Sequence, residues 1–298
     1  MKFQMKSVAK TVLNAALPTA ILLSTFGVDA APFYFSTGNP DGLIGTGSKP
    51  SGASGTEIES ADDFFLNQAT SITNASFYGL VPLNSNATSV RLEMYRVFPL
   101  DSTNPPSGKV PARTNSPSDV AFAEREGLDL TYATTGLGAF TVTNTVLSNI
   151  NKSPNQTTGG EGADSGQQVR FDVQLLSPFN LPADHYFFIP QVQLDQGDFL
   201  WLSAAKPIAA PGTPFTPDLQ SWIRNENLAP DWLRIGTDVI GAAGAGTRPT
   251  FNAAFSLTGE TLAVPEPATL ALLGAGLFAL LGLRRLSGCG KSKAAVRG

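Results

Sequence analysis

The chain has 298 residues and carries 20 basic against 24 acidic side chains. Charged residues make up 15% of it, below the quarter that is typical of globular domains, and turn-forming residues take their place. Residues 31–264 hold 12 basic and 22 acidic side chains, a net charge of −10, because eight basic residues lie in the two terminal segments. Such a field repels phosphate backbones, so the composition argues against nucleic acid as a partner.

The single cysteine, Cys289, lies beyond a hydrophobic run near the C-terminus. Residues 31–263 therefore contain no thiol. This excludes a disulfide framework, a cysteine zinc site and a cysteine nucleophile from that segment.

Residues 1–30 have the three regions of a secretory signal peptide. Three lysines within the first ten residues precede an apolar stretch over 12–26. Val28 and Ala30 then occupy the −3 and −1 positions for cleavage before Ala31. We expect a signal helix that signal peptidase removes during export across the inner membrane; a buried first helix of the domain is the alternative.

A second targeting signal occupies residues 264–298. Its motif is Val264-Pro265-Glu266-Pro267, and an uncharged run over 268–283 ends at Arg284-Arg285. As a helix this run spans about 24 Å, and snorkelling arginines can make up the difference from a hydrocarbon core of ~30 Å. We predict a transmembrane helix over 268–283 with a basic cytoplasmic tail over 284–298, so that the preceding domain faces outward.

This order of motif, short helix and arginine pair resembles the PEP-CTERM sorting signal of Gram-negative bacteria. The resemblance implies processing by exosortase and a link to exopolysaccharide and biofilm production. It implies transient or permanent anchoring in the inner membrane, followed by the cell surface or the extracellular matrix. The extension Leu286–Gly298 departs from the usual signal, which stops soon after its basic cluster. A permanent single-pass anchor is the alternative.

Between the two targeting signals, the pattern of residues 31–263 predicts short strands separated by turn residues. Apolar and polar residues alternate strictly over 169–175 and over 90–94. Further strands are expected over 72–81, 128–133, 140–146, 186–194, 199–203 and 251–257. We predict an all-β fold: one extracellular antiparallel β-sandwich of the jelly-roll kind.

Segments 61–66, 72–79 and 252–259 loosely resemble the opening and closing strands of secreted bacterial β-sandwich domains. The segments 37–60, 101–119 and 149–167 are expected to be loops, the last two disordered or facing a partner. Residues 217–227 are the best helix candidate outside the termini.

The sequence contains no clear catalytic motif, and we expect that the protein is not an enzyme. The one histidine, His185, begins an apolar strand, which favours a structural role over that of a catalytic base. A glycoside hydrolase needs two carboxylates about 5–9.5 Å apart. Asp62 and Asp63 would point to opposite strand faces, and Asp195 and Asp198 flank a turn. A secreted glycoside hydrolase remains the weaker alternative.

Three tryptophans, Trp201, Trp222 and Trp232, lie in one Pro-rich stretch. Clustered indoles can stack on sugar rings, or they can plug the open end of a sandwich. An oxygen-rich turn near Asp41 is the candidate for a calcium site, and no other cofactor is expected.

These observations predict an exported, non-catalytic surface or matrix protein associated with extracellular polysaccharide. The alternative is a carbohydrate-binding module that uses the tryptophans.

Overall fold

The computed structural model describes residues 30–52, 55–151, 156–205, 219–241 and 249–262, together with Gly274, Gly276 and Leu277. The chain divides into a compact unit over Asp29–Ala263 and a second unit that combines Met1–Val28 with Val264–Gly298. The predicted signal helix, the sorting motif and nearly all of the transmembrane helix lie outside the described residues. Within the described residues, no helix has both the length and the apolar character needed to span a bilayer.

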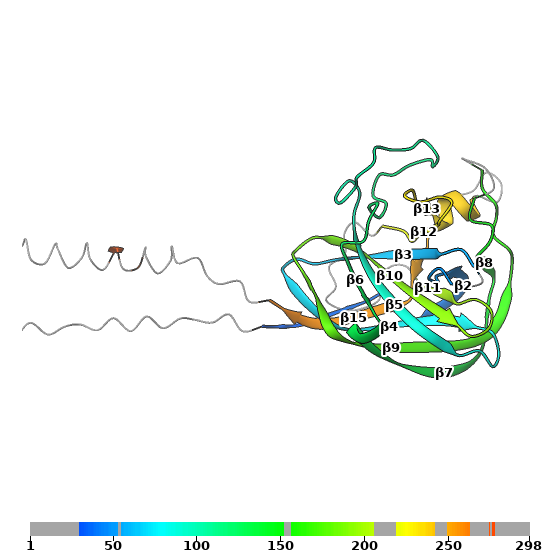
Figure 1. Cartoon of the computed structure of the whole chain (residues 1–298), viewed down its shortest axis with the longest axis horizontal. Coiled ribbons are helices and arrows are strands. Elements are labelled where there is room, and N and C mark those ends of the chain that lie inside the picture. Colours follow the sequence, from blue (N-terminus) through cyan, green and yellow to red (C-terminus); the bar gives the residue numbers. More distant parts are fainter. Residues whose placement is uncertain are drawn as a thin grey trace, which may run out of the picture. The chain divides into compact units, whose positions relative to one another are not determined.

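The unit Asp29–Ala263 consists of two β-sheets, as Figure 1 shows. The nine-stranded sheet contains β1 (Pro32–Ser36), β2 (Pro40–Gly47), β4 (Thr70–Val81), β7 (Leu130–Val142), β8 (Asn144–Val146), β9 (Asp164–Leu181), β11 (Leu200–Ala204), β14 (Asn252–Ala253) and β15 (Phe255–Thr261). The six-stranded sheet contains β3 (Ile58–Phe65), β5 (Ala87–Arg96), β6 (Ala123–Glu126), β10 (His185–Leu194), β12 (Trp222–Asn225) and β13 (Leu233–Arg234). The described helical segments are a 3₁₀ turn over Gly127–Asp129, a π-helical segment over Ile235–Ile240 and the three residues near the C-terminus. The all-β prediction is therefore confirmed at the level of a mostly-β domain with two sheets.

The six-stranded sheet is antiparallel throughout, but the nine-stranded sheet contains one parallel pair. Strands β2 and β8 run in the same direction, with Ile44 opposite Asn144. The prediction of a wholly antiparallel sandwich is wrong at this pair. About a hundred residues, including five strands, connect β2 to β8, so no tight hairpin forces them to run in opposite directions. The jelly-roll connectivity stays a prediction.

The main core lies between the two sheets. It combines buried side chains from β4, β9 and β15 of one sheet with side chains from β5 and β10 of the other. Aromatic rings dominate the contact: Phe77 stacks on Phe171 at a centroid distance of 5.0 Å, and Phe188 of the opposite sheet stacks on Phe255 at 5.1 Å. The two sheets therefore pack face to face.

Strand β10 shows that the six-stranded sheet is buried on both faces. Tyr186 and Phe188 point into the main core, whereas Phe187 and Ile189 join a second cluster with Tyr95 and two tryptophans. All four β10 residues are fully buried. Four consecutive apolar residues are expected only where both sides of a strand are removed from water.

The outer face of this sheet is covered by residues 97–122, which we call the cover segment (Figure 1). Arg113 of this segment forms ion pairs with Asp119 and with Asp231. Trp232 Nε1 donates to the Ser118 carbonyl at 3.2 Å. The predicted loop over 101–119 is thus tied to the sheet by buried charges.

The second predicted insertion, 149–167, is also anchored where it is described. Strand β9 begins within it, at Asp164. The carboxylate of Glu161 accepts hydrogen bonds from the backbone N–H groups of Leu147, Ser148 and Asn149 at 2.5–3.0 Å. These bonds hold the return of the chain against the end of β8.

Two local expectations are wrong. The Gly-rich segment 37–60 contains β2 and the start of β3, because its glycines allow close packing. A Cβ on Gly45 would lie 3.1 Å from Leu200 Cβ, and one on Gly47 would lie 2.7 Å from Leu147 Cδ1. The described part of the predicted helix over 217–227, residues 219–227, contains β12 and not a helix, since Trp222–Asn225 pair with β3.

Replacing Gly79 should destabilise the unit, because this β4 glycine lies beneath the ring of Phe199. An added Cβ would overlap the ring carbons of Phe199. We expect Gly79→Ala to lower the free energy of unfolding by about 1–3 kcal/mol. Urea denaturation measures this, with Gln174→Ala on the exposed face of β9 as the control. Equal stability of the two variants would contradict the packing described here.

Candidate functional site

The three tryptophans do not form a binding platform. Their side chains are 0–2% exposed, and they lie in two different places. Trp201 packs between the sheets, whereas Trp222 and Trp232 lie under the cover segment. An indole at this exposure offers no face to a sugar ring, so the glycan-binding role predicted for these residues has no support and we do not propose it. They are core residues on the two faces of the six-stranded sheet: Trp201 packs against its inner face, and Trp222 and Trp232 lie on its outer face. None of them plugs an end of the sandwich.

A buried ionic cluster lies beside Trp222 and Trp232. Arg224 binds both carboxylate oxygens of Glu59 and also donates to the Tyr95 hydroxyl at 2.9 Å. Its guanidinium carbon lies 4.3 Å from the centre of the Trp232 ring. Burial, followed by the nearby charge of Glu59, raises the pKa of Tyr95. The arrangement neutralises Glu59 inside the protein, as a buried charge requires.

Glu93 is the second carboxylate of this face, and it has no cation of its own there. It is 5% exposed, and its Oε2 has no hydrogen-bond partner among the described residues. Burial raises the pKa of Glu93 to about 8, with further upward contributions from Glu59, Glu124 and Glu57 that outweigh the lowering by Arg91. A raised carboxyl pKa is also a property of general acids. Here, however, both carboxylates are buried, and neither lines a described cleft.

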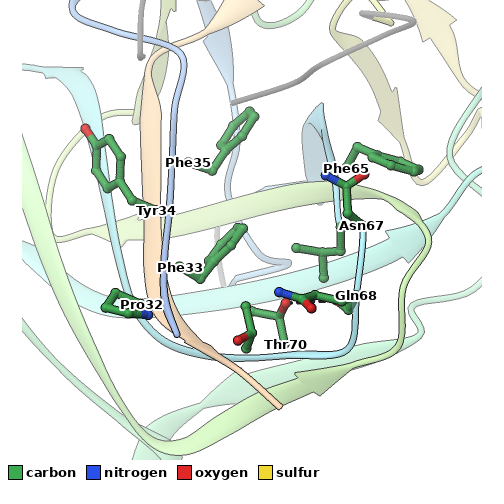
Figure 2. A pocket seen from close by; sticks show the side chains of 10 residues that line it. Pro32, Phe33, Tyr34, Phe35, Phe65, Asn67, Gln68 and Thr70 are labelled. Carbon is green, nitrogen blue, oxygen red and sulfur yellow. Dashed lines mark hydrogen bonds between the residues drawn. The ribbon is translucent and has the colours of Figure 1, made fainter. Parts of the chain in front are cut away.

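An uncharged cleft opens elsewhere, where β1, β15 and the β3–β4 turn meet (Figure 2). Its volume is about 200 Å³, and it is lined by Pro32, Phe33, Tyr34, Phe35, Phe65, Leu66, Asn67, Gln68, Thr70 and Thr261. Phe33 lies on the β1 side and Gln68 on the side of the turn, whereas Tyr34 points away from them. The lining therefore combines aromatic rings with amide and hydroxyl groups and contains no titratable carboxylate.

Local structure explains how the polar side chains reach this cleft. The exposed pair Asn67 and Gln68 forms the turn after β3. The Thr70 hydroxyl donates to the Gln68 carbonyl at 2.9 Å, which fixes the turn and leaves the Gln68 amide free to face outward. Phe65 is 37% exposed and meets the ring of His185 edge-on. Rings and amides that face outward together are the groups that bind a neutral, hydroxyl-rich ligand.

His185 has a structural partner. Its Nε2 lies 2.6 Å from Oδ2 of Asp63, a buried carboxylate that also accepts the backbone N–H of Leu219. Asp62, the neighbour of Asp63, accepts hydrogen bonds from Ser221 Oγ and from the backbone N–H of Ala253. The two adjacent carboxylates bind different groups, as expected for successive positions of a strand.

The remaining acidic candidates also make structural contacts. Asp41 accepts hydrogen bonds from the Leu43 N–H at 2.9 Å and from Ser203 Oγ at 2.5 Å. Within the described part of the chain, no group of three or more acidic, histidine or cysteine side chains is arranged to hold a metal, so the calcium prediction gains no support. Asp195 accepts from the backbone N–H of Asn86, and Asp198 pairs with Lys49.

The sequence alone does not reveal the cleft, because its side chains come from three segments: 32–35, 65–70 about thirty residues further on, and Thr261 about 190 residues beyond that. The signal in the sequence is the apolar pair Phe33 and Phe35 on either side of the exposed Tyr34, together with the amides of Asn67 and Gln68 directly after the buried Leu66. Neither pattern indicates a site until β1 is placed beside β15 and the β3–β4 turn.

The described part of the chain is thus a cysteine-free, two-sheet β domain with an uncharged cleft. The comparison with known families identifies the segment that follows it: residues 263–285 match the PEP-CTERM protein-sorting motif. This confirms the resemblance seen in the sequence. Neither a curated protein nor a solved structure matches the chain. The motif implies an exported protein that exosortase processes and that is sorted at the cell surface.

Replacing Arg113 should strongly destabilise the unit. Arg113→Ala leaves the buried carboxylates of Asp119 and Asp231 without their cation, which costs about 3–5 kcal/mol for a buried pair. The matched control is Arg170→Ala, since Arg170 forms an exposed pair with Asp172 whose loss costs about 0–1 kcal/mol. Thermal or urea unfolding measures both. A loss for Arg113→Ala no larger than for the control would show that the cover segment is held by other contacts.

The pKa of Glu93 predicts a pH dependence of stability. The folded-state pKa of about 8 exceeds the ordinary value of 4.5, so the unfolded chain releases this proton first. The contribution of Glu93 to stability should therefore fall as the pH rises from about 4.5 to about 8 and stay low above that. Glu93→Gln removes this titration.

Urea unfolding at pH 5, 7 and 9 compares the two proteins. The difference between Glu93→Gln and the wild type should grow with pH, and the variant should be the more stable protein at pH 9. Parallel pH profiles would mean that Glu93 ionises in the folded protein as it does in the unfolded chain.

Proposed function

We propose that this protein is a non-catalytic component of the cell surface or extracellular matrix that binds a neutral extracellular polysaccharide. The observation that carries the proposal is the cleft between β1 and the β3–β4 turn. The sorting motif supports the compartment, because it implies export and sorting at the cell surface. The cleft supports the ligand class.

The chemistry of the cleft fits a sugar unit. Phe33 and Phe65 offer flat apolar surfaces, and Asn67 and Gln68 offer amide donors and acceptors beside them. A sugar ring has an apolar face and a rim of hydroxyl groups, which suits this combination. The volume of about 200 Å³ is below the roughly 300–1,000 Å³ of sites for drug-sized ligands. It suits one unit of a polymer whose remaining units lie outside.

Charge favours a neutral polymer over an anionic one. No lysine or arginine lines the cleft, and residues 31–264 carry a net charge of −10. An acidic polysaccharide would therefore be repelled by the domain and would find no cation at this cleft. The absence of a carboxylate from the lining supports a binding role over hydrolysis there.

The test is binding of the unit Asp29–Ala263 to a panel of neutral and anionic polysaccharides, measured by affinity electrophoresis with calcium and with chelator. We expect neutral polymers to bind, and chelation to leave binding unchanged. Gln68→Ala and Phe65→Ala should each weaken binding about fivefold, which corresponds to roughly 1 kcal/mol.

The matched controls are Gln174→Ala and Leu83→Ala, since both residues are exposed away from the cleft and should leave binding unchanged. Retention of anionic polymers alone would overturn the proposal, and so would failure to retain any polymer.

A further inference from the structure

Strand β7 is a long, uncharged edge of the nine-stranded sheet. It spans Leu130–Val142 with the sequence LTYATTGLGAFTV, which contains no charged residue and no proline. Among the described strands it pairs only with β9, and seven consecutive residues from Ala133 to Ala139 are exposed. In Figure 1, β7 lies at the lower margin of the unit. One row of its backbone N–H and C=O groups therefore faces away from the sheet.

The other sheet edges are short or blocked. Strand β13 has two residues, and β6 has four, three of them charged. Strand β8 has three residues, and its Thr145 carbonyl accepts the backbone N–H of Glu161. Strand β1 has five residues and begins with a proline. These features prevent strands of other molecules from pairing at an edge.

Even the part of β9 that extends beyond β7 is capped. Arg125 Nε donates to the Ser177 carbonyl at 2.6 Å, and its Nη2 donates to the Pro178 carbonyl at 2.9 Å. The protection therefore stops where β7 begins. This contrast singles out β7 as an edge that is left open for a partner.

We propose that β7 joins two copies of this protein by pairing antiparallel with β7 of the second copy. The unpaired backbone groups select an extended strand as the partner. A strand edge that meets its own copy across a two-fold axis is self-complementary. The N–H groups of each strand then lie opposite the C=O groups of the other. The inference does not depend on the proposed polysaccharide binding.

Charge supports a second copy as the partner. Two units that each carry about −10 repel one another, so contact requires a surface where no like charges meet. Strand β7 is such a surface, since none of its 13 residues is charged. A basic partner segment would instead require acidic residues on β7.

The geometry limits the product to a dimer. A bulge at Leu137 interrupts the pairing of β7 with β9 between Gly136 and Gly138. The segment Leu130–Gly136 keeps regular register with β9 and is the stretch that we assign to the contact. Because one edge pairs with itself, the assembly closes at two copies and does not grow into a fibre.

The experiment is sedimentation of the unit Asp29–Ala263 over a range of concentrations without polysaccharide. This unit contains all of the hydrophobic clusters described in the structure, so it can be tested by itself. We expect a monomer–dimer equilibrium in the wild type. Ala133→Lys should weaken dimerisation at least tenfold, because Ala133 is the centre of the segment Leu130–Gly136 and the two-fold axis there brings the two added charges together. Leu83→Lys, which adds a charge on an exposed turn residue, should leave dimerisation unchanged.

A cysteine variant provides an independent measurement. The unit contains no cysteine, so a disulfide formed by Ala133→Cys, at the centre of the paired segment, must join two copies. We expect this variant to cross-link faster than Thr88→Cys, whose side chain is exposed on β5. Circular dichroism confirms that each variant is folded. A wild type that stays monomeric at every concentration would overturn the proposal, as would a dimer that Ala133→Lys leaves intact, or equal cross-linking rates.

Discussion

Burial of both faces of the six-stranded sheet is the constraint on which the rest of this domain depends. One face packs on the nine-stranded sheet through aromatic rings of β10 and β15. The other face would be exposed if residues 97–122 did not lie over it. Strands β3, β5 and β12 place Glu59, Glu93 and Arg224 on that covered face. Their charges must then be balanced within the protein, since water does not reach them.

The same constraint explains where the domain can bind anything. The tryptophans are used to fill the covered face and the main core, so they are not accessible to a ligand. Among the buried acids, Glu59 pairs with Arg224, Asp119 and Asp231 pair with Arg113, and Asp63 contacts His185. Two of the accessible features are uncharged: the small aromatic and amide cleft and the open edge of β7. The proposed binding role therefore rests on neutral groups, although residues 31–264 carry a net charge of −10.

Much of the strand content could be predicted from local patterns, but the candidate site could not. The alternation over Val169–Leu175 and Val90–Met94 predicts β9 and β5 correctly. In β9 it reflects one buried and one exposed face, and in β5 it reflects an apolar face on the main core and a polar face under the cover segment. Local patterns do not predict strand β2. Its glycines are explained by close packing against Leu147 and Leu200, which are distant in the sequence, and not by a local preference for strand. The PEP-CTERM motif is contiguous and was recognised. The cleft depends on the register of β1 with β15, which no local pattern reveals.

The position of β15 has a mechanical consequence. This strand is the last described element before the sorting motif, and it lies between β1 and β4 with hydrogen bonds on both sides. A pull along β15 from an anchored C-terminus would load these two ladders in shear, so that many bonds resist together and do not open one at a time. The domain is thus joined to its sorting segment through an interior strand of the nine-stranded sheet.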